Sequence, residues 1–206
     1  MFFLCDVTPY HVSPKTPLVL YADDFDGNGT VDPVITAYND GRAHPVFPRN
    51  TLGRQLPSWK RKMTSYAMYG NWTEADLPPL SDAGQRLEAT EFRSLYLEND
   101  GQGNFTVLPL PALAQTAPLR AAVPITLEDG RPGLLCVQND FAWEPLAGRQ
   151  DAGTGFALTL DADGAMEVLP NYISIRGDAR SIVGLRDGEK TVYYVGINDG
   201  AVLELE

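Results

Sequence analysis

The chain has few of the residues on which catalytic sites usually depend. Its 206 residues include two histidines, His11 and His44, and two cysteines, Cys5 and Cys136. Neither histidine has a partner at metal-binding spacing, and the sequence contains no glycine-rich phosphate loop, nucleophile elbow or defensible cysteine–histidine pair. The sequence therefore shows no recognisable catalytic constellation, and its two cysteines are compatible with either a disulfide or two buried thiols.

Basic residues and long apolar runs are scarce as well. Lysine and arginine number 16 against 27 acidic residues, a net charge of −11, which argues against binding to the phosphates of nucleic acid. No stretch approaches the roughly 20 apolar residues of a membrane span. The apolar residues Met1–Cys5 are too few for a signal peptide and lack a basic start, so we expect an N-terminal strand there.

What the chain has instead is an acidic loop between two apolar runs. Oxygen-bearing groups occur at every second position of its first half, and Gly27 and Gly29 leave the backbone between them free to turn. Calcium takes six to eight oxygen ligands of this kind. We therefore predict a calcium site with the ligands Asp24, Asp26, Asn28, Thr30 (through its carbonyl) and Asp32. The alternative is an acidic turn that binds nothing.

The runs beside this loop distinguish it from an EF-hand. An EF-hand requires a glutamate at position twelve, which is Ile35 here, and it joins two helices. Residues 18–22 and 34–38 are short and rich in β-branched and aromatic residues, which predicts strands. The loop is therefore expected to join two antiparallel strands.

A helical insertion is expected over about residues 50–80. Apolar residues recur at helical spacing, namely Leu52, Leu56, Trp59 and Met63. A helix cap is predicted at Asn50 or Thr51, and Pro57 predicts a kink or two short helices. Residues 73–76 resemble a capping box for a single turn.

The remainder of the chain has the pattern of short strands separated by turns. Strands are expected at 92–97, 104–108, 119–127, 133–138, 155–160, 165–169, 179–186, 191–197 and 201–205. A unit of strand, tight loop, apolar strand and Asn-Asp occurs three times, ending at Asp40, Asp140 and Asp199. Only the first copy keeps the full acidic loop. With two hairpins per repeat, each repeat is expected to form a four-stranded propeller blade.

The acidic loop, this repeat and the turn at residues 99–105 resemble FG-GAP/VCBS repeat proteins, in particular a secreted or cell-envelope subgroup. The matching segments are 21–33, 55–62, 65–69 and 139–149. The resemblance implies an all-β fold, a partial β-propeller of about three four-stranded blades with a small helical insertion, spanning residues 1–206 as one segment. It also implies calcium at the predicted ligands, an extracellular or envelope location, and no defined reaction.

The function predicted from these observations is a non-catalytic, calcium-binding module for a surface, a glycan or a protein. The alternative is a module of a carbohydrate-active lyase or hydrolase that uses acidic residues. The long loop after the second repeat is the candidate ligand site, with Asn139, Asp140, Trp143, Arg149 and Asp151. Trp143 is alternatively a packed lid on its blade.

Closure of the ring is the last expectation from the sequence. About three blades leave two flanks open, so we expect either upstream blades on a longer product or self-association. Residues 2–7 are expected to pair with residues 201–205.

Overall fold

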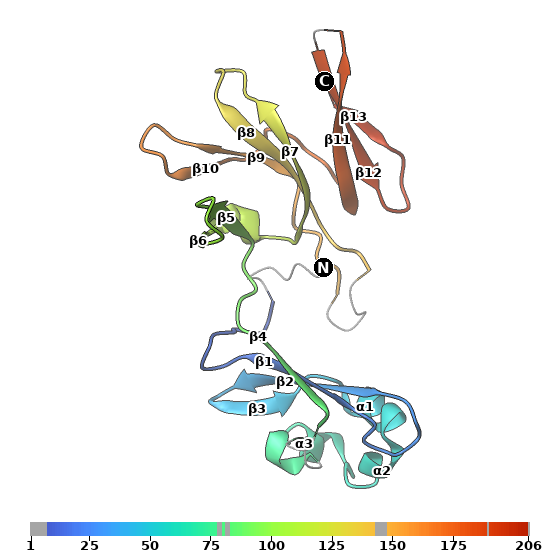
Figure 1. Cartoon of the computed structure of the whole chain (residues 1–206). Coiled ribbons are helices and arrows are strands. Elements are labelled where there is room, and N and C mark those ends of the chain that lie inside the picture. Colours follow the sequence, from blue (N-terminus) through green and yellow to red (C-terminus); the bar gives the residue numbers. More distant parts are fainter. Residues whose placement is uncertain (1–7, 78–79, 81–82, 143–147, 189, 206) are drawn as a thin grey trace. The chain divides into compact units, whose positions relative to one another are not determined.

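The computed structural model describes residues 8–77, 80, 83–142, 148–188 and 190–205. These residues are predominantly β and form four antiparallel sheets with three short helices, which confirms the predicted all-β class. They form no closed barrel or propeller. The chain divides into an N-terminal unit, residues 9–91, and a C-terminal unit, Thr8 with the described residues from 92 onward. Each unit is described by itself (Figure 1).

The N-terminal unit is built on one four-stranded sheet in the order β3-β2-β1-β4. Its strands are β1 (Leu18–Asp23), β2 (Asp32–Asn39), β3 (Arg42–Pro45) and β4 (Gln85–Ala89). As predicted, β1 and β2 flank the acidic loop, and their pairing ends at Asp23↔Asp32, so the two ends of the loop lie opposite each other. Asp40 and Gly41 join β2 to β3 with φ of 50° and 77°, since a type I′ hairpin turn requires positive φ at both positions.

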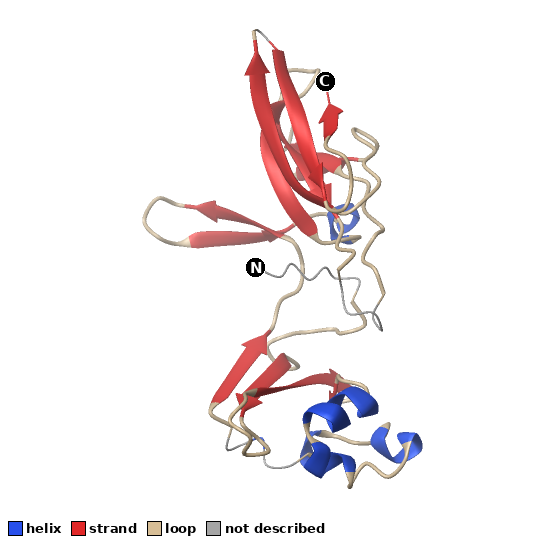
Figure 2. Cartoon of the chain, turned by 90° about the vertical axis from the view of Figure 1, so that its right-hand side faces the viewer, coloured by secondary structure: helices blue, strands red, loops and turns tan. Residues whose placement is uncertain are grey.

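Three short helices lie beside this sheet (Figure 2): α1 (Arg49–Gln55), α2 (Pro57–Lys60) and α3 (Tyr66–Tyr69). The predicted break at Pro57 is confirmed, because α1 ends before it and α2 begins on it. The cap predicted at Asn50 or Thr51 is wrong, since α1 starts directly after Pro48. A proline suits this place because it fixes φ near the helical value.

The helices and the sheet share one core. The four residues predicted from helical spacing are all buried, and they pack against three side chains of β1 and β2. The helical residues are Leu52, Leu56, Trp59 and Met63, and the sheet residues are Val19, Tyr21 and Val34. The predicted capping box is also confirmed, because the Asp76 carboxylate accepts a 2.8 Å bond from the Thr73 N–H.

The C-terminal unit contains the other three sheets (Figure 1). The two-stranded sheet is β5 (Leu95–Asn99) and β6 (Phe105–Pro109). The four-stranded sheet runs β10-β9-β8-β7, with β7 (Leu119–Thr126), β8 (Pro132–Gln138), β9 (Phe156–Leu160) and β10 (Met166–Leu169). The three-stranded sheet runs β11-β12-β13, with β11 (Ala179–Asp187), β12 (Lys190–Ile197) and β13 (Leu203–Leu205).

The expected combination of two hairpins per repeat holds in one copy. In the second repeat, β7–β8 and β9–β10 form one sheet, as predicted. In the first repeat the expectation is wrong: β3 and β4 complete the sheet around β1–β2, and the β5–β6 hairpin forms a sheet of its own. A two-residue turn brings β3 onto the edge of β2 at a small loop-closure cost, and the other edge is taken by β4, which pairs with β1 from a distant part of the chain. The N-terminal strand predicted at 2–7 lies outside the described residues.

Candidate functional site

The acidic loop brings three of the predicted ligands together. One carboxylate oxygen from each of Asp24, Asp26 and Asp32 lies within 4.8 Å of the other two. Asp26 is exposed, Asp24 is half-buried, and Asp32 at the start of β2 is only 4% exposed. Such a set of hard oxygen donors can hold a metal ion, and its chemistry suits calcium.

The loop backbone is held in its curve by its own carboxylates. Asp24 accepts bonds from the N–H groups of Asn28 at 2.9 Å and Gly29 at 2.7 Å. Asp32 accepts one from the N–H of Phe25 at 3.2 Å, which connects the two ends of the loop. Gly27 and Gly29 have φ of 75° and 84°, so these two turns need glycine. The loop therefore holds its carboxylates close together through backbone bonds.

The two remaining predicted ligands are bonded to each other. The side-chain oxygen of Asn28 accepts a 2.8 Å bond from the N–H of Thr30. Both residues are exposed and lie on the same turn as the three carboxylates. Coordination of a metal by Asn28 and by the Thr30 carbonyl therefore stays a prediction.

Three carboxylates in one loop create a surplus of negative charge. Within the described part of the chain, no lysine or arginine forms an ion pair with any of them. Burial raises the pKa of Asp32 above its ordinary value, and the charges of Asp26 and Asp24 raise it further. The pKa of Asp24 is lowered, chiefly by the bond from the Gly29 N–H. A divalent cation would relieve this repulsion, so the residues fit the metal that the family resemblance implies.

The loop is anchored to the core of the N-terminal unit. The ring of Phe25 lies 5.6 Å from the ring of Trp59 on α2, centroid to centroid. Asp23, at the end of β1, accepts bonds from the N–H of Asp24 at 2.8 Å and from the N–H of Gly84 before β4 at 2.7 Å. The helical insertion therefore supports the acidic loop through the contact between Trp59 and Phe25.

The candidate ligand loop after β8 contains both residues with buried, hydrogen-bonded side chains and residues with exposed side chains. The Asn139 side chain is buried and bonds to the backbone of Gly153 and Gly177, at 2.8 Å in each case. Arg149 is exposed and stacks over the ring of Phe141, 4.9 Å from its centroid. Asp151 is also exposed, and Trp143 lies outside the described residues.

Asp140 belongs to a charged cluster that joins two sheets. Its carboxylate accepts bonds from Arg120 on β7 at 3.3 Å and from Arg180 on β11 at 3.0 Å. Arg180 also bonds to Asp178 at 2.7 Å, and this pair raises the pKa of Arg180. Both arginines sit at bulges, where the register shifts by one residue. The side chains of Asn139 and Asp140 therefore hold the fold together.

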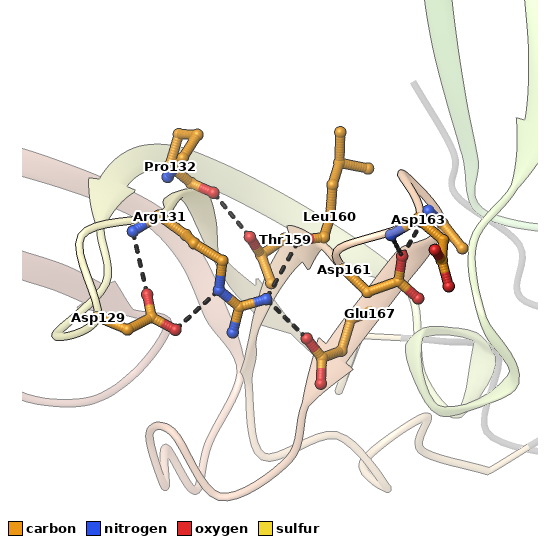
Figure 3. A network of polar contacts seen from close by, with 9 residues as sticks. Asp129, Arg131, Pro132, Thr159, Leu160, Asp161, Asp163 and Glu167 are labelled. Carbon is orange, nitrogen blue, oxygen red and sulfur yellow. Dashed lines mark hydrogen bonds and ion pairs between the residues drawn. The ribbon is translucent and has the colours of Figure 1, made fainter.

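A second network of polar contacts lies on the β7–β8 turn (Figure 3). In the predicted repeat, this turn corresponds to the acidic loop of the first copy. Arg131 bonds to Asp129 at 2.7 Å, to Glu167 on β10 at 2.9 Å and to the carbonyl of Leu160 at 3.1 Å. These bonds connect the turn to the neighbouring strands. This role of Arg131 was not predicted, because its partner Glu167 lies 36 residues further along the chain.

Of the two cysteines, Cys136 lies within the described residues and Cys5 lies outside them. Cys136 on β8 is a buried free thiol, and burial raises its pKa to about 12. A thiol in this environment stays protonated and unreactive at neutral pH.

Three comparisons with known proteins were negative. No family model, no curated protein and no solved structure matches the chain. Among the described residues, no helix is long and apolar enough to cross a membrane.

Proposed function

We propose that the chain is a calcium-binding segment of a β-propeller with a non-catalytic role in binding. The observation that carries this proposal is the convergence of three carboxylates in one loop, with no basic side chain of the described residues paired to them. Calcium would be held by Asp24, Asp26 and Asp32, completed by Asn28 and the Thr30 carbonyl, and would stabilise the β1–β2 end of the sheet.

The propeller part of the proposal rests on sheet order. The strands β7 to β10 follow one another across their sheet as in a propeller blade, and β11 to β13 begin the same order. An extracellular or envelope location would supply calcium at the concentrations that such exposed sites need.

The binding partner is proposed to be a glycan or a protein. The loop after β8 exposes Asp151 and also Arg149, which stacks flat over the half-buried ring of Phe141. These are the kinds of group that bind sugar rings and hydroxyls. A glycan array probed with the purified protein tests the proposal of a glycan ligand directly. If no glycan on the array binds, the proposed partner is a protein.

The calcium site is tested by thermal unfolding in calcium and after its removal. Calcium binds the folded loop only, so at 100 times its dissociation constant it should add about 2.7 kcal/mol of stability. Asp26→Ala should abolish most of this gain. Asp100→Ala is the matched control, because the Asp100 carboxylate accepts similar backbone bonds but belongs to no such group of three carboxylates among the described residues. Identical melting curves with and without calcium would refute the site.

A further inference from the structure

Two hairpins of the C-terminal unit are built alike. β5–β6 and β9–β10 have the same register at an offset of 61 residues, so that Asn99↔Phe105 corresponds to Leu160↔Met166. Their turns also match. Asp100 and Asp161 each accept bonds from the backbone N–H groups two and four residues further along the chain. The two hairpins are therefore copies of one structural element.

Their surroundings differ. β9 is hydrogen-bonded to β8 on one side and to β10 on the other, whereas β5 has, among the described residues, a strand partner only in β6. Residues 156–159 of β9 are accordingly buried, while three of the four corresponding β5 residues are exposed. Leu97 is 54% exposed, and its counterpart Leu158 is 6% exposed. Within the part of the chain that the structure describes, β5 thus lacks the second neighbouring strand that β9 has.

The free edge of β5 can be assigned from the bonds at both ends of the hairpin. The Asp100 N–H donates to the Asn104 carbonyl, and the Leu110 N–H donates to the Ser94 carbonyl. Because bonded residues alternate along an antiparallel ladder, the backbone of Leu97 points away from β6. A two-stranded hairpin is marginal by itself, and an open apolar edge is a template for another strand.

One face of the hairpin looks onto the neighbouring four-stranded sheet. Tyr96, Glu98 and Leu108 line an open groove of about 810 Å³ against the β8–β10 sheet. The opposite face carries Leu97 and Val107, which lie directly across from each other and are 54% and 53% exposed. The edge and this second face are therefore available for a partner.

We propose that β5 pairs with β5 of a second copy of this chain, antiparallel and centred on Leu97. Two hairpins would then form a four-stranded sheet, the strand number of the two largest sheets in the chain. This register places no two like charges opposite each other, because Glu98 would face the neutral Tyr96 of the other copy. Leu97 would face its own counterpart, which joins the two apolar stripes into one. The contact is isologous, as expected for a two-fold dimer.

The register fixes a distance that cross-linking can measure. Leu97 and its counterpart would form a hydrogen-bonded pair with Cα atoms about 5.5 Å apart, within the range of a disulfide. Val107 lies one strand further out on each side, so its counterparts would be separated by about 15 Å. The two residues are equally exposed, which makes Val107 the matched control for Leu97.

The experiment compares Leu97→Cys with Val107→Cys, both carrying Cys5→Ser, under mild oxidation at micromolar concentration. We expect a covalent dimer from Leu97→Cys and little from Val107→Cys, with wild type dimeric by light scattering and Leu97→Lys monomeric. A monomeric wild type, or equal cross-linking of the two variants, overturns the proposal. The same comparison in calcium and without calcium separates this result from the metal site, since the edge pairing needs no metal.

Discussion

The β1–β2 loop and the β7–β8 turn join corresponding strands in two copies of the repeat, but they are held together differently. In the first, three carboxylates converge without a basic partner among the described residues. In the second, Asp129 and Glu167 are bound by the guanidinium of Arg131. The carboxylates of the acidic loop could hold a metal ion, whereas those of the shorter turn are paired with a guanidinium of the chain itself. The two corresponding turns therefore arrange their acidic side chains in different ways, one without and one with a guanidinium between them.

The two regions also differ in how they reach the core. Phe25 of the acidic loop packs on the buried Trp59, while the Arg131 network lies at the exposed end of its sheet. A substitution in the helical insertion should therefore affect the predicted metal site. The same substitution should leave the Arg131 network of the β7–β8 turn unaffected.

The largest expected effect is that of Trp59→Ala. Trp59 is 3% exposed, and removing a buried tryptophan costs about 3–5 kcal/mol of unfolding free energy. It should also weaken calcium binding, because Phe25 loses its support. Leu52→Ala is the matched control, since Leu52 is fully buried in the same core but is not the loop's aromatic contact. Calorimetric titration with calcium distinguishes the two, and equal affinities would show that the anchor does not matter.

The next effect is that of Arg131→Gln, which removes two ion pairs and one carbonyl contact. The side chains of Arg131, Asp129 and Glu167 are 37%, 52% and 41% exposed, so we expect only a small loss of stability in urea unfolding, reduced further at high salt. The loss should be the same with and without calcium, in contrast to Asp26→Ala. Arg86→Gln serves as the control, because Arg86 pairs with the single acid Glu88 at similar exposure. A loss that appears only in calcium would contradict the separation of the two regions.

What the sequence predicted well is what depends on near neighbours in the chain. The three converging carboxylates lie within nine residues, the break at Pro57 follows from one residue, and β1 and β2 are adjacent strands. These features are settled by turn chemistry and local periodicity, before the tertiary structure is known.

The features that were missed depend on distant contacts. β4 has the sequence Gln-Arg-Leu-Glu-Ala, which lacks the β-branched pattern of a strand, and it is a strand because it pairs with β1. Glu167 reaches Arg131 across 36 residues, and Arg180 reaches Asp140 across 40. The sequence gives no periodic signal for such pairs, since they depend on which strands become neighbours.

The smallest expected effect is an opposite dependence on pH in the two regions. In metal-free protein, burial and the charges of Asp26 and Asp24 raise the pKa of Asp32 above 3.8. The stability contributed by Asp32 is therefore present below its ordinary pKa and is lost as the pH rises through the raised pKa. The pKa of Asp129 is lowered, first by the Arg131 N–H and then by its guanidinium. Its contribution is present above 3.8 and is lost as the pH falls through the lowered pKa.

These signs can be tested by urea unfolding of metal-free wild type, Asp32→Asn and Asp129→Asn between about pH 3 and pH 6. As the pH rises, Asp32→Asn should gain stability relative to wild type, because it no longer carries a repelled charge. Asp129→Asn should lose stability relative to wild type, because it no longer holds the guanidinium of Arg131. Calcium should reverse only the first trend, since a bound cation makes the Asp32 carboxylate favourable. Two trends of the same sign would mean that the acidic loop is already neutralised within the chain and has no need of a metal.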